Sequence, residues 1–202
     1  KPDQEAVPSR QFDISKIDFE LLSREFAHTR RKNLLLRDLD ELVNQQLAKM
    51  LFANPQRIDY YDRYQEIIDA YNAEQNRATI EKTFMDLMEL ASSLDTEQQR
   101  YVREGFSSDE ELSVYDLLFS ENLTKQEIET IKKVSVDLLT KIKQQIAKLD
   151  HWTDKQETKA IVDNLIRKTL WQELPNSYDV SDIQTYQKKI YEYVYMRYPE
   201  VA

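Results

Sequence analysis

The chain contains a single glycine, Gly105, in 202 residues. Phosphate-binding loops, dinucleotide-binding turns and the nucleophile elbows of hydrolases all require glycine, because the backbone there approaches a ligand closely or adopts a positive φ. Motor ATPases, dinucleotide-dependent enzymes and α/β-hydrolases are therefore nearly excluded within this chain. Since it also contains only five prolines, the sequence predicts helices joined by short connections.

The composition indicates a soluble globular protein. Hydrophobic residues make up 41% and charged residues 32% of the chain, a balance outside the range of disordered proteins. The longest apolar runs have three or four residues, whereas a membrane span needs roughly 20. The absence of cysteine excludes disulfides and thiolate metal sites and fits a cytoplasmic location. Because the chain begins Lys1-Pro2-Asp3 without methionine, we expect it to be cut from a longer protein.

The net charge of −9 is unevenly distributed. Residues 57–123 carry six basic and sixteen acidic side chains, whereas residues 125–170 carry ten basic and seven acidic ones. Binding of polyanions depends on concentrated Lys and Arg. We therefore expect any contact with nucleic acid to be local.

Apolar residues recur at three- and four-residue spacing along most of the chain, which is typical of amphipathic helices. Several Ser or Thr residues are followed three positions later by Glu or Gln, the pattern of a capping box that satisfies backbone N–H groups at a helix start. These pairs are Thr96/Gln99, Ser108/Glu111, Thr124/Glu127, Thr153/Gln156 and Ser181/Gln184. No alternating run of β-branched residues and no hairpin signal predicts a strand.

The sequence therefore predicts an all-α fold of about eight helices in an irregular multi-helix bundle without significant sheet. The expected helical ranges are 17–29, 34–52, 58–73, 78–94, 97–104, 109–119, 125–149, 154–173 and 181–198. Gly105 is expected in a left-handed helix C-cap. Residues 1–14 are expected to form a loose N-terminal segment, and residues 15–202 a helical domain that divides further into sub-bundles 15–95 and 96–202.

No constellation of side chains predicts a catalytic, cofactor-binding or metal-binding site. The two histidines, His28 and His151, are expected to face solvent or to lie near helix caps. Acidic pairs such as Glu110-Glu111 are expected in first helical turns, where negative charge complements the helix dipole.

The strongest local positive feature is the run Arg30-Arg31-Lys32, with Arg37 close behind it. These four side chains are candidates for contacts with a DNA phosphate backbone, provided that other basic groups fold beside them. The alternative is a solvated connection between two helices that carries scattered charge, and the sequence alone favours this second interpretation.

Aromatic residues concentrate in the last helical range. It carries five tyrosines: Tyr186, Tyr191, Tyr193, Tyr195 and Tyr198. Five are too many for one buried stripe, because each buried hydroxyl needs a hydrogen-bond partner. We therefore treat these tyrosines as candidates for a partner interface. The default expectation for Trp152 and Trp171 is packing in the core.

Several segments form an ordered set along the chain. They are residues 19–51, with HTRRKNL at 28–34, then 54–64, 67–72, 108–118 (SDEELSVYDLL) and 149–152 (LDHW) followed by 153–171. In this order they resemble the C-terminal helical region of type I restriction enzyme R subunits, and the likeness covers most of residues 12–198. The chain departs from the family pattern where His151 separates Asp150 from Trp152, and where Leu174-Pro175 replaces a Tyr-Gly-Tyr-Pro turn.

The resemblance implies a parent protein with upstream nuclease and motor ATPase domains, which uses ATP and Mg to translocate double-stranded DNA before cutting it. It also implies that the helical region docks to the methyltransferase and specificity subunits. We therefore expect this chain to be a non-catalytic assembly domain, without a cofactor, of an ATP-dependent type I site-specific deoxyribonuclease. The alternatives are a DNA-backbone contact module centred on Arg30, Arg31, Lys32 and Arg37 and, least favoured, an autonomous enzyme.

Overall fold

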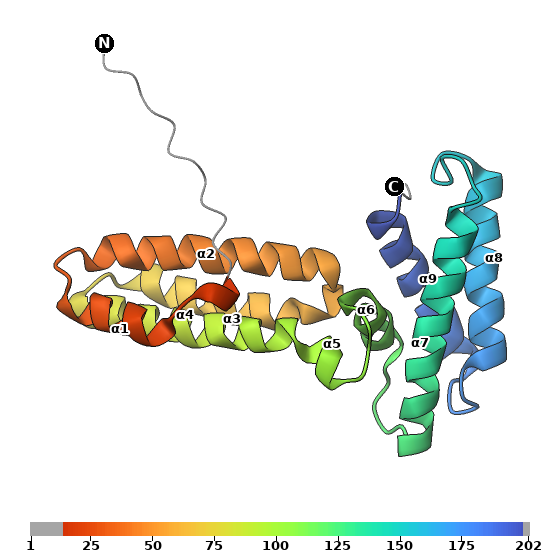
Figure 1. Ribbon diagram of the computed structural model, residues 1–202, viewed down its shortest axis with the longest axis horizontal. Coiled ribbons are helices and arrows are strands. Elements are labelled where there is room, and N and C mark those ends of the chain that lie inside the picture. Colours follow the sequence, from red (N-terminus) through yellow and green to blue (C-terminus); the bar gives the residue numbers. More distant parts are fainter. Residues whose placement is uncertain (1–13, 200–202) are drawn as a thin grey trace, which may run out of the picture. The chain divides into compact units, whose positions relative to one another are not determined.

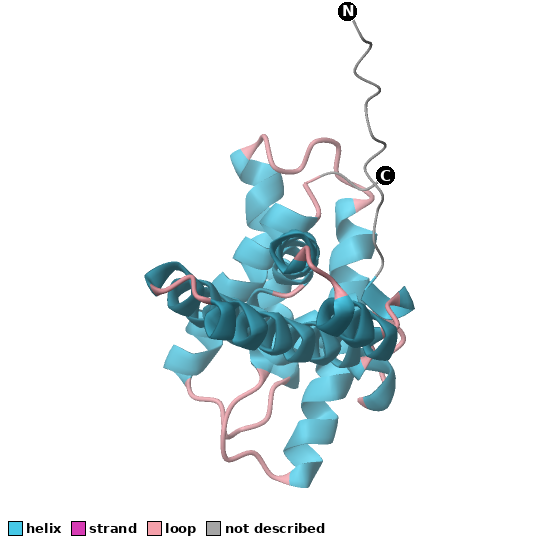
Figure 2. Cartoon of the chain, turned by 90° about the vertical axis from the view of Figure 1, so that its left-hand side faces the viewer, coloured by secondary structure: helices cyan, strands magenta, loops and turns pink. Residues whose placement is uncertain are grey.

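The computed structural model describes residues 14–199, and every regular element in this range is helical (Figures 1 and 2). The elements are η1 (Ile14–Lys16), α1 (Phe19–His28), α2 (Lys32–Ala53), η2 (Pro55–Arg57), α3 (Ile58–Ala73), α4 (Arg77–Gln98), α5 (Arg100–Arg103), α6 (Asp109–Leu118), α7 (Lys125–Ile146), α8 (Gln156–Glu173) and α9 (Val180–Arg197). The all-α prediction is confirmed, and the α-helices of this range follow the expected helical ranges in order. None of them is long and apolar enough to cross a membrane.

Contacts divide the chain into two compact units. Unit 1 contains the described residues through Met50 together with Arg57–Gln98, and unit 2 contains Leu51–Gln56 together with the described residues from Gln99 onward. The last residues of α2 therefore belong to unit 2. The expected loose segment 1–14 lies outside the described residues except for Ile14, which begins η1 and is buried.

Unit 1 encloses one core between η1 and helices α1 to α4. Phe26 of α1 stacks on Phe84 of α4, with 3.7 Å between the ring centroids. Helix α2 contributes Val43, which is fully buried. Tyr64 of α3 is buried as well, and its hydroxyl donates to the Asp40 carboxylate of α2 over 2.7 Å. These four side chains, each from a different helix, belong to the core of unit 1.

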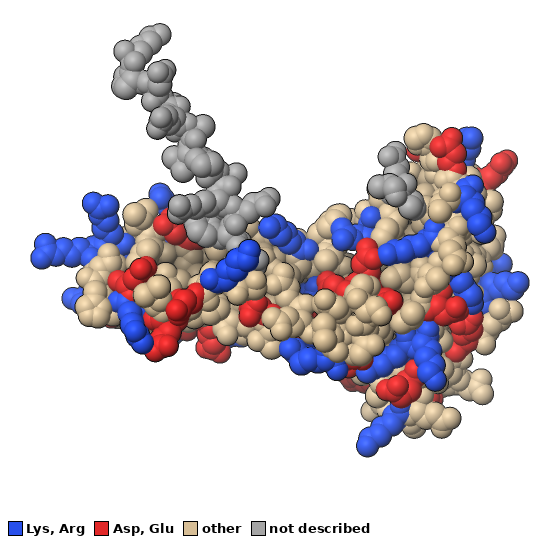
Figure 3. Space-filling view, in the orientation of Figure 1, with Lys and Arg blue, Asp and Glu red and all other residues tan. Residues whose placement is uncertain are grey.

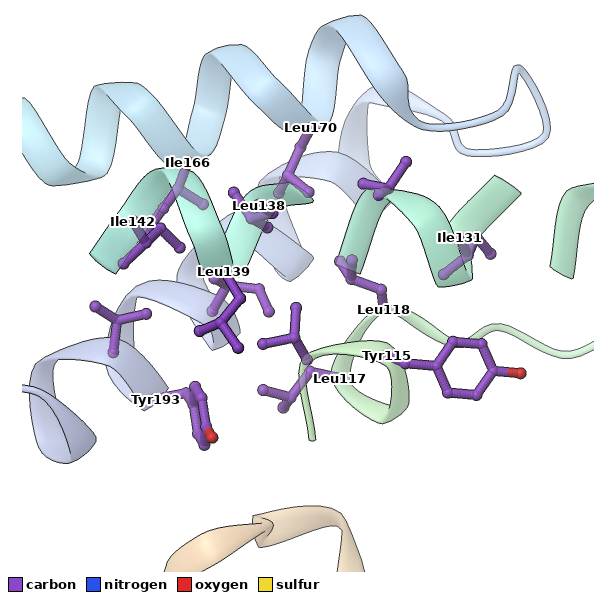
Figure 4. Packing of buried hydrophobic residues seen from close by; sticks show 14 of the residues in the cluster. Tyr115, Leu117, Leu118, Ile131, Leu138, Leu139, Ile142, Ile166, Leu170 and Tyr193 are labelled. Carbon is purple, nitrogen blue, oxygen red and sulfur yellow. The ribbon is translucent and has the colours of Figure 1, made fainter. Parts of the chain in front are cut away.

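Unit 2 has a separate core, formed mainly by helices α6 to α9. Figure 4 shows part of it, in which residues of α6, α7, α8 and α9 point toward one another. The labelled residues are Tyr115, Leu117, Leu118, Ile131, Leu138, Leu139, Ile142, Ile166, Leu170 and Tyr193. Trp152, in the connection between α7 and α8, is 1% exposed, and its Nε1 donates to the carbonyl oxygen of Tyr198 over 2.6 Å.

Two of the predicted capping pairs begin helices as expected. Thr124 and Glu127 form a reciprocal capping box at the start of α7: Thr124 N donates to Glu127 Oε2 over 2.8 Å, and Glu127 N donates to Thr124 Oγ1 over 3.3 Å. Ser108 caps α6 by accepting from the backbone N–H of Glu111. Both helices begin at the predicted place because these side chains satisfy N–H groups that the first turn leaves free.

The other three predicted pairs do not cap helices. Thr96 lies inside α4, where its hydroxyl donates to a backbone carbonyl one turn earlier over 3.0 Å. Helix α8 begins without a side-chain cap, so Thr153 plays no such part. Helix α9 begins with a reciprocal box of Asp179 and Asp182, not at Ser181, because a carboxylate accepts the same N–H bonds as a hydroxyl and Asp179 stands where the chain enters the helix.

Gly105 ends the short helix α5 as predicted. Its φ is +84°, in the left-handed region that glycine adopts without steric cost. Gly105 N donates to the carbonyl of Val102 over 3.1 Å, and Phe106 N donates to the carbonyl of Tyr101 over 2.8 Å. These two bonds define a Schellman motif, and Phe106 is buried in the core of unit 2 directly after it.

Candidate functional site

The predicted basic run lies where α1 ends and α2 begins. Thr29 caps the C-terminus of α1, and Lys32 is the first residue of α2. Arg31 N donates to Thr29 Oγ1 over 3.1 Å, which holds the turn between the two helices. Arg30 and Arg31 are both exposed, so their guanidinium groups are accessible from solvent.

A surface hollow of about 650 Å³ brings this connection beside the start of α4. Its lining consists of Thr29, Arg30, Arg31, Lys32, Asn33, Leu34, Arg77 and Ile80. Helices α1 to α4 run alternately in opposite directions, so the α1–α2 and α3–α4 connections come to the same end of unit 1 (Figure 1). Lys and Arg side chains project at this end in Figure 3. Arg77 was not predicted from the sequence, because its position beside the basic run depends on how helices α1 to α4 pack against one another.

One carboxylate balances part of the positive charge of the hollow. Glu81 Oε1 accepts from Lys32 Nζ over 2.8 Å and from Arg77 Nε over 3.2 Å. The hydrogen bond from Lys32, followed by the one from Arg77, holds the pKa of Glu81 below its ordinary value. Lys32 Nζ also lies 4.8 Å from the centre of the Phe26 ring. Four cations and one carboxylate leave a local excess of three positive charges.

Arg37 does not line the hollow, although the sequence grouped it with the basic run. It lies further along α2, is exposed, and approaches the Asp38 carboxylate to 4.0 Å. The structure therefore brings together Arg30, Arg31 and Lys32 but not Arg37 at this end of unit 1.

The five candidate tyrosines do not share one surface. Tyr193 is 5% exposed and belongs to the core of unit 2, because it follows the buried Ile190 by three residues on the inward face of α9. Tyr186 and Tyr198 are half-buried. Tyr191 and Tyr195 both meet the Trp152 ring edge-on, with centroids 6.2 and 5.7 Å away.

Tyr195 is the exposed member of the five, with 39% of its surface accessible. Lys159 Nζ of α8 lies 5.8 Å from the centre of its ring. Tyr191 beside it is half-buried, and burial, together with the nearby Asp163 charge, raises the pKa of its hydroxyl. The surface that the tyrosines offer to a partner is thus centred on Tyr195, over the buried Trp152.

The two tryptophans have different environments. Trp152 packs in the core as expected, but the expectation for Trp171 is wrong, since 49% of its surface is accessible. Helix α8 turns Ile166 and Leu170 inward, and the residue after Leu170 points about 100° away from it around the helix. Trp171 is therefore an exposed aromatic side chain.

A polar cluster joins α6, α7 and α9 inside unit 2. Glu110 forms a short ion pair with Lys143, and the Lys143 Nζ lies 5.3 Å from the centre of the Tyr198 ring. Burial by itself raises the pKa of Glu110, but hydrogen bonds from Lys143 and Tyr198 outweigh it and hold the pKa below its ordinary value. This member of the predicted acidic pair therefore has a structural partner.

Within residues 14–199, no group of three or more His, Asp or Glu side chains is arranged to hold a metal ion. His28 Nδ1 lies 2.8 Å from the carbonyl oxygen of Arg24, and His151 Nε2 lies 3.6 Å from the Asp150 carboxylate. Both histidines are exposed near helix ends, as predicted.

Comparison with known proteins identifies one family. The family model described as "Type I restriction enzyme HindI endonuclease subunit-like, C-terminal" matches residues 5–198. The match extends over nearly the whole chain and includes both units. No curated protein and no solved structure matches the chain.

Proposed function

The chain belongs to the family of type I restriction enzyme HindI endonuclease subunit-like C-terminal regions, and from this premise we propose that it is a helical assembly domain. In this role it docks the DNA-translocating motor and nuclease of its parent onto the methyltransferase and specificity subunits. ATP and Mg would act in upstream domains of that parent, an ATP-dependent type I site-specific deoxyribonuclease that acts on double-stranded DNA. The chain itself would be non-catalytic.

The observation that carries the proposal is the family match over both helical units. The glycine content supports a non-catalytic role, because the single glycine serves as a helix C-cap and leaves none for a phosphate-binding loop. The charged side chains of the polar clusters described above are engaged in pairs that hold helices together, such as Glu110 with Lys143.

The aromatic side chains exposed on unit 2 supply contacts for docking. Tyr195 on α9 and Trp171 on α8 are 39% and 49% exposed, and tyrosine and tryptophan are the residue types most enriched in binding hot spots. The acidic stretch 57–123 and the mildly basic stretch 125–170 would set the orientation of docking through charge complementarity.

The proposal is tested by measuring the affinity of the 202-residue chain for a methyltransferase–specificity complex. We expect Tyr195→Ala to weaken binding by about tenfold or more, since a hot-spot aromatic contributes at least about 1.4 kcal/mol. Trp171→Ala is expected to weaken it in the same direction. Thermal melting of each variant verifies that the fold persists.

Tyr61 is a matched control for Tyr195. It lies on α3 of unit 1 and is 37% exposed, so Tyr61→Ala removes an equally accessible tyrosine from another surface and is expected to leave the affinity unchanged. Absence of binding by the unmodified chain at micromolar concentrations would contradict docking. Equal effects of Tyr61→Ala and Tyr195→Ala would contradict the assignment of the surface.

A further inference from the structure

We propose that the hollow lined by Arg30, Arg31, Lys32 and Arg77 binds the phosphate backbone of double-stranded DNA. The proposal starts from the distribution of charge. The chain has a net charge of −9, but four basic side chains from two helix connections line this hollow, and one carboxylate, Glu81, lies among them. A local excess of positive charge on an acidic protein attracts a polyanion to that place and not to the surface as a whole.

Three of the four cations are available to a ligand. Within the described residues neither Arg30 nor Arg31 forms an ion pair through its side chain, and both are exposed. Arg77 is 85% exposed and forms an i,i+4 pair with Glu81, a type of surface pair that contributes little and exchanges readily. Lys32 is only 22% exposed and is held by Glu81 and Phe26. Lys32 therefore fixes the Glu81 carboxylate, while the three arginines present their guanidinium groups.

The chemistry of the lining favours a duplex backbone. A guanidinium group presents two parallel N–H donors to a phosphate, which a lysine ammonium does not. The lining contains no aromatic ring on which an unpaired base could stack, so it lacks the feature by which proteins hold single strands. Binding of this kind does not require contacts with base edges, because phosphate contacts hold the duplex without reading its sequence.

The spacing of negative charges favours duplex DNA over an acidic protein as the ligand of the hollow. Duplex DNA carries a negative charge every ~1.7 Å along its axis, so several phosphates come within reach of three neighbouring arginines. An acidic helix presents carboxylates on one face only every ~5–6 Å, and fewer of them meet the same cations. The inference does not rest on the docking proposal, since the hollow lies in unit 1 and the docking residues Tyr195 and Trp171 lie in unit 2.

The test is the salt dependence of binding between the 202-residue chain and a fluorescently labelled duplex of random sequence, followed by anisotropy. If Arg30, Arg31 and Arg77 each neutralise one phosphate, the logarithm of the association constant falls with the logarithm of salt concentration with a slope of about −2.7. Arg77→Gln is expected to change this slope to about −1.8, and Arg30→Gln with Arg31→Gln to about −0.9.

Matched control variants separate the hollow from net charge. Arg63 on α3 pairs with Glu89 over 2.9 Å and is 41% exposed, so Arg63→Gln removes a surface-paired arginine like Arg77 but outside the hollow. Arg167 lies on α8 of unit 2 and is exposed. Arg63→Gln with Arg167→Gln therefore matches the double variant in charge, and both controls are expected to keep the slope of the unmodified chain. Arg30→Lys with Arg31→Lys also keeps the slope, because the slope counts charges, while the loss of bidentate contacts lowers the affinity at every salt concentration.

Three results overturn the proposal. The first is no binding to the duplex at low salt. The second is a slope that changes equally in the hollow variants and in their charge-matched controls. The third is displacement of the duplex by poly-glutamate at a comparable concentration of negative charges, which assigns the hollow to an acidic protein surface.

Discussion

The buried ion pair of Arg57 and Glu97 offers a sharp test of what holds unit 1 together. Arg57 Nε lies 3.0 Å from Glu97 Oε1, and the two side chains are 3% and 8% exposed. Arg57 is the last residue of η2 and precedes α3, whereas Glu97 lies in the last turn of α4. The pair therefore ties the start of α3 to the end of α4.

The magnitude follows from the burial of both charges. Glu97→Leu removes the carboxylate that pairs with a buried guanidinium, and Arg57→Met removes the guanidinium that pairs with a buried carboxylate. Breaking such a pair on one side costs about 3–5 kcal/mol. Changing both residues removes both charges, and replacing a buried pair with apolar side chains of similar volume is close to neutral. We therefore expect each single variant to lower the free energy of unfolding by about 3–5 kcal/mol, and the double variant to regain most of that loss.

Urea denaturation followed by far-ultraviolet circular dichroism measures these free energies. Both tryptophans lie in unit 2, so their fluorescence reports on unit 2, and hydrogen exchange of the α3 and α4 amides locates the loss in unit 1. Solvated surface pairs couple by only about 0.2–1 kcal/mol. Single variants that cost less than about 1 kcal/mol, with effects that add in the double variant, would refute the reasoning that burial makes this pair strong.

Three further expectations concern unit 2. The pKa of Glu110 in the folded protein lies below its ordinary value of 4.5. Its pair with Lys143 therefore stabilises the fold above pH 4.5, and this stabilisation is lost as the pH falls through the folded pKa. The melting temperatures of Glu110→Gln and of the unmodified chain should differ at neutral pH and converge in acid. Gly105→Ala is expected to cost about 1–2 kcal/mol in urea denaturation, since an added Cβ meets no atom within 4 Å and only the left-handed backbone opposes it; a negligible cost would contradict the positive φ. Trp152→Ala is expected to cost about 3–5 kcal/mol and Trp171→Ala less than about 1 kcal/mol, and equal costs would contradict their different burial.

The helices were predictable because their signals are local. The range 58–73 coincides with α3, and the range 109–119 differs from α6 by one residue. Thr124 with Glu127 and the left-handed Gly105 act within a few residues of themselves, so they can be read from sequence. The cap of α9 is also a local signal, but it was not predicted because it consists of Asp179 and Asp182. The predicted capping pattern was Ser or Thr followed three positions later by Glu or Gln, although Asp caps a helix as well as Ser or Thr.

The candidate surfaces were only partly predictable, because exposure depends on which neighbours a helix meets. The number of tyrosines on α9 predicted that they could not all be buried, and Tyr195 is exposed. The sequence did not reveal that Tyr193 lies in the core, or that Trp171 is exposed while Trp152 is buried. A large aromatic residue is compatible with either environment, and its own helix does not decide between them.

By itself, the sequence determined that the described chain is helical, where most of its helices begin and end, and which segments carry the likeness to its family. Each of these properties depends on residues that are close together along the chain. Only the tertiary structure decided that Arg77 joins Arg30 and Arg31, that Arg37 does not, and which aromatic side chains reach the surface. Those outcomes depend on contacts between residues far apart in sequence, which form when packed helices bury their apolar faces against one another.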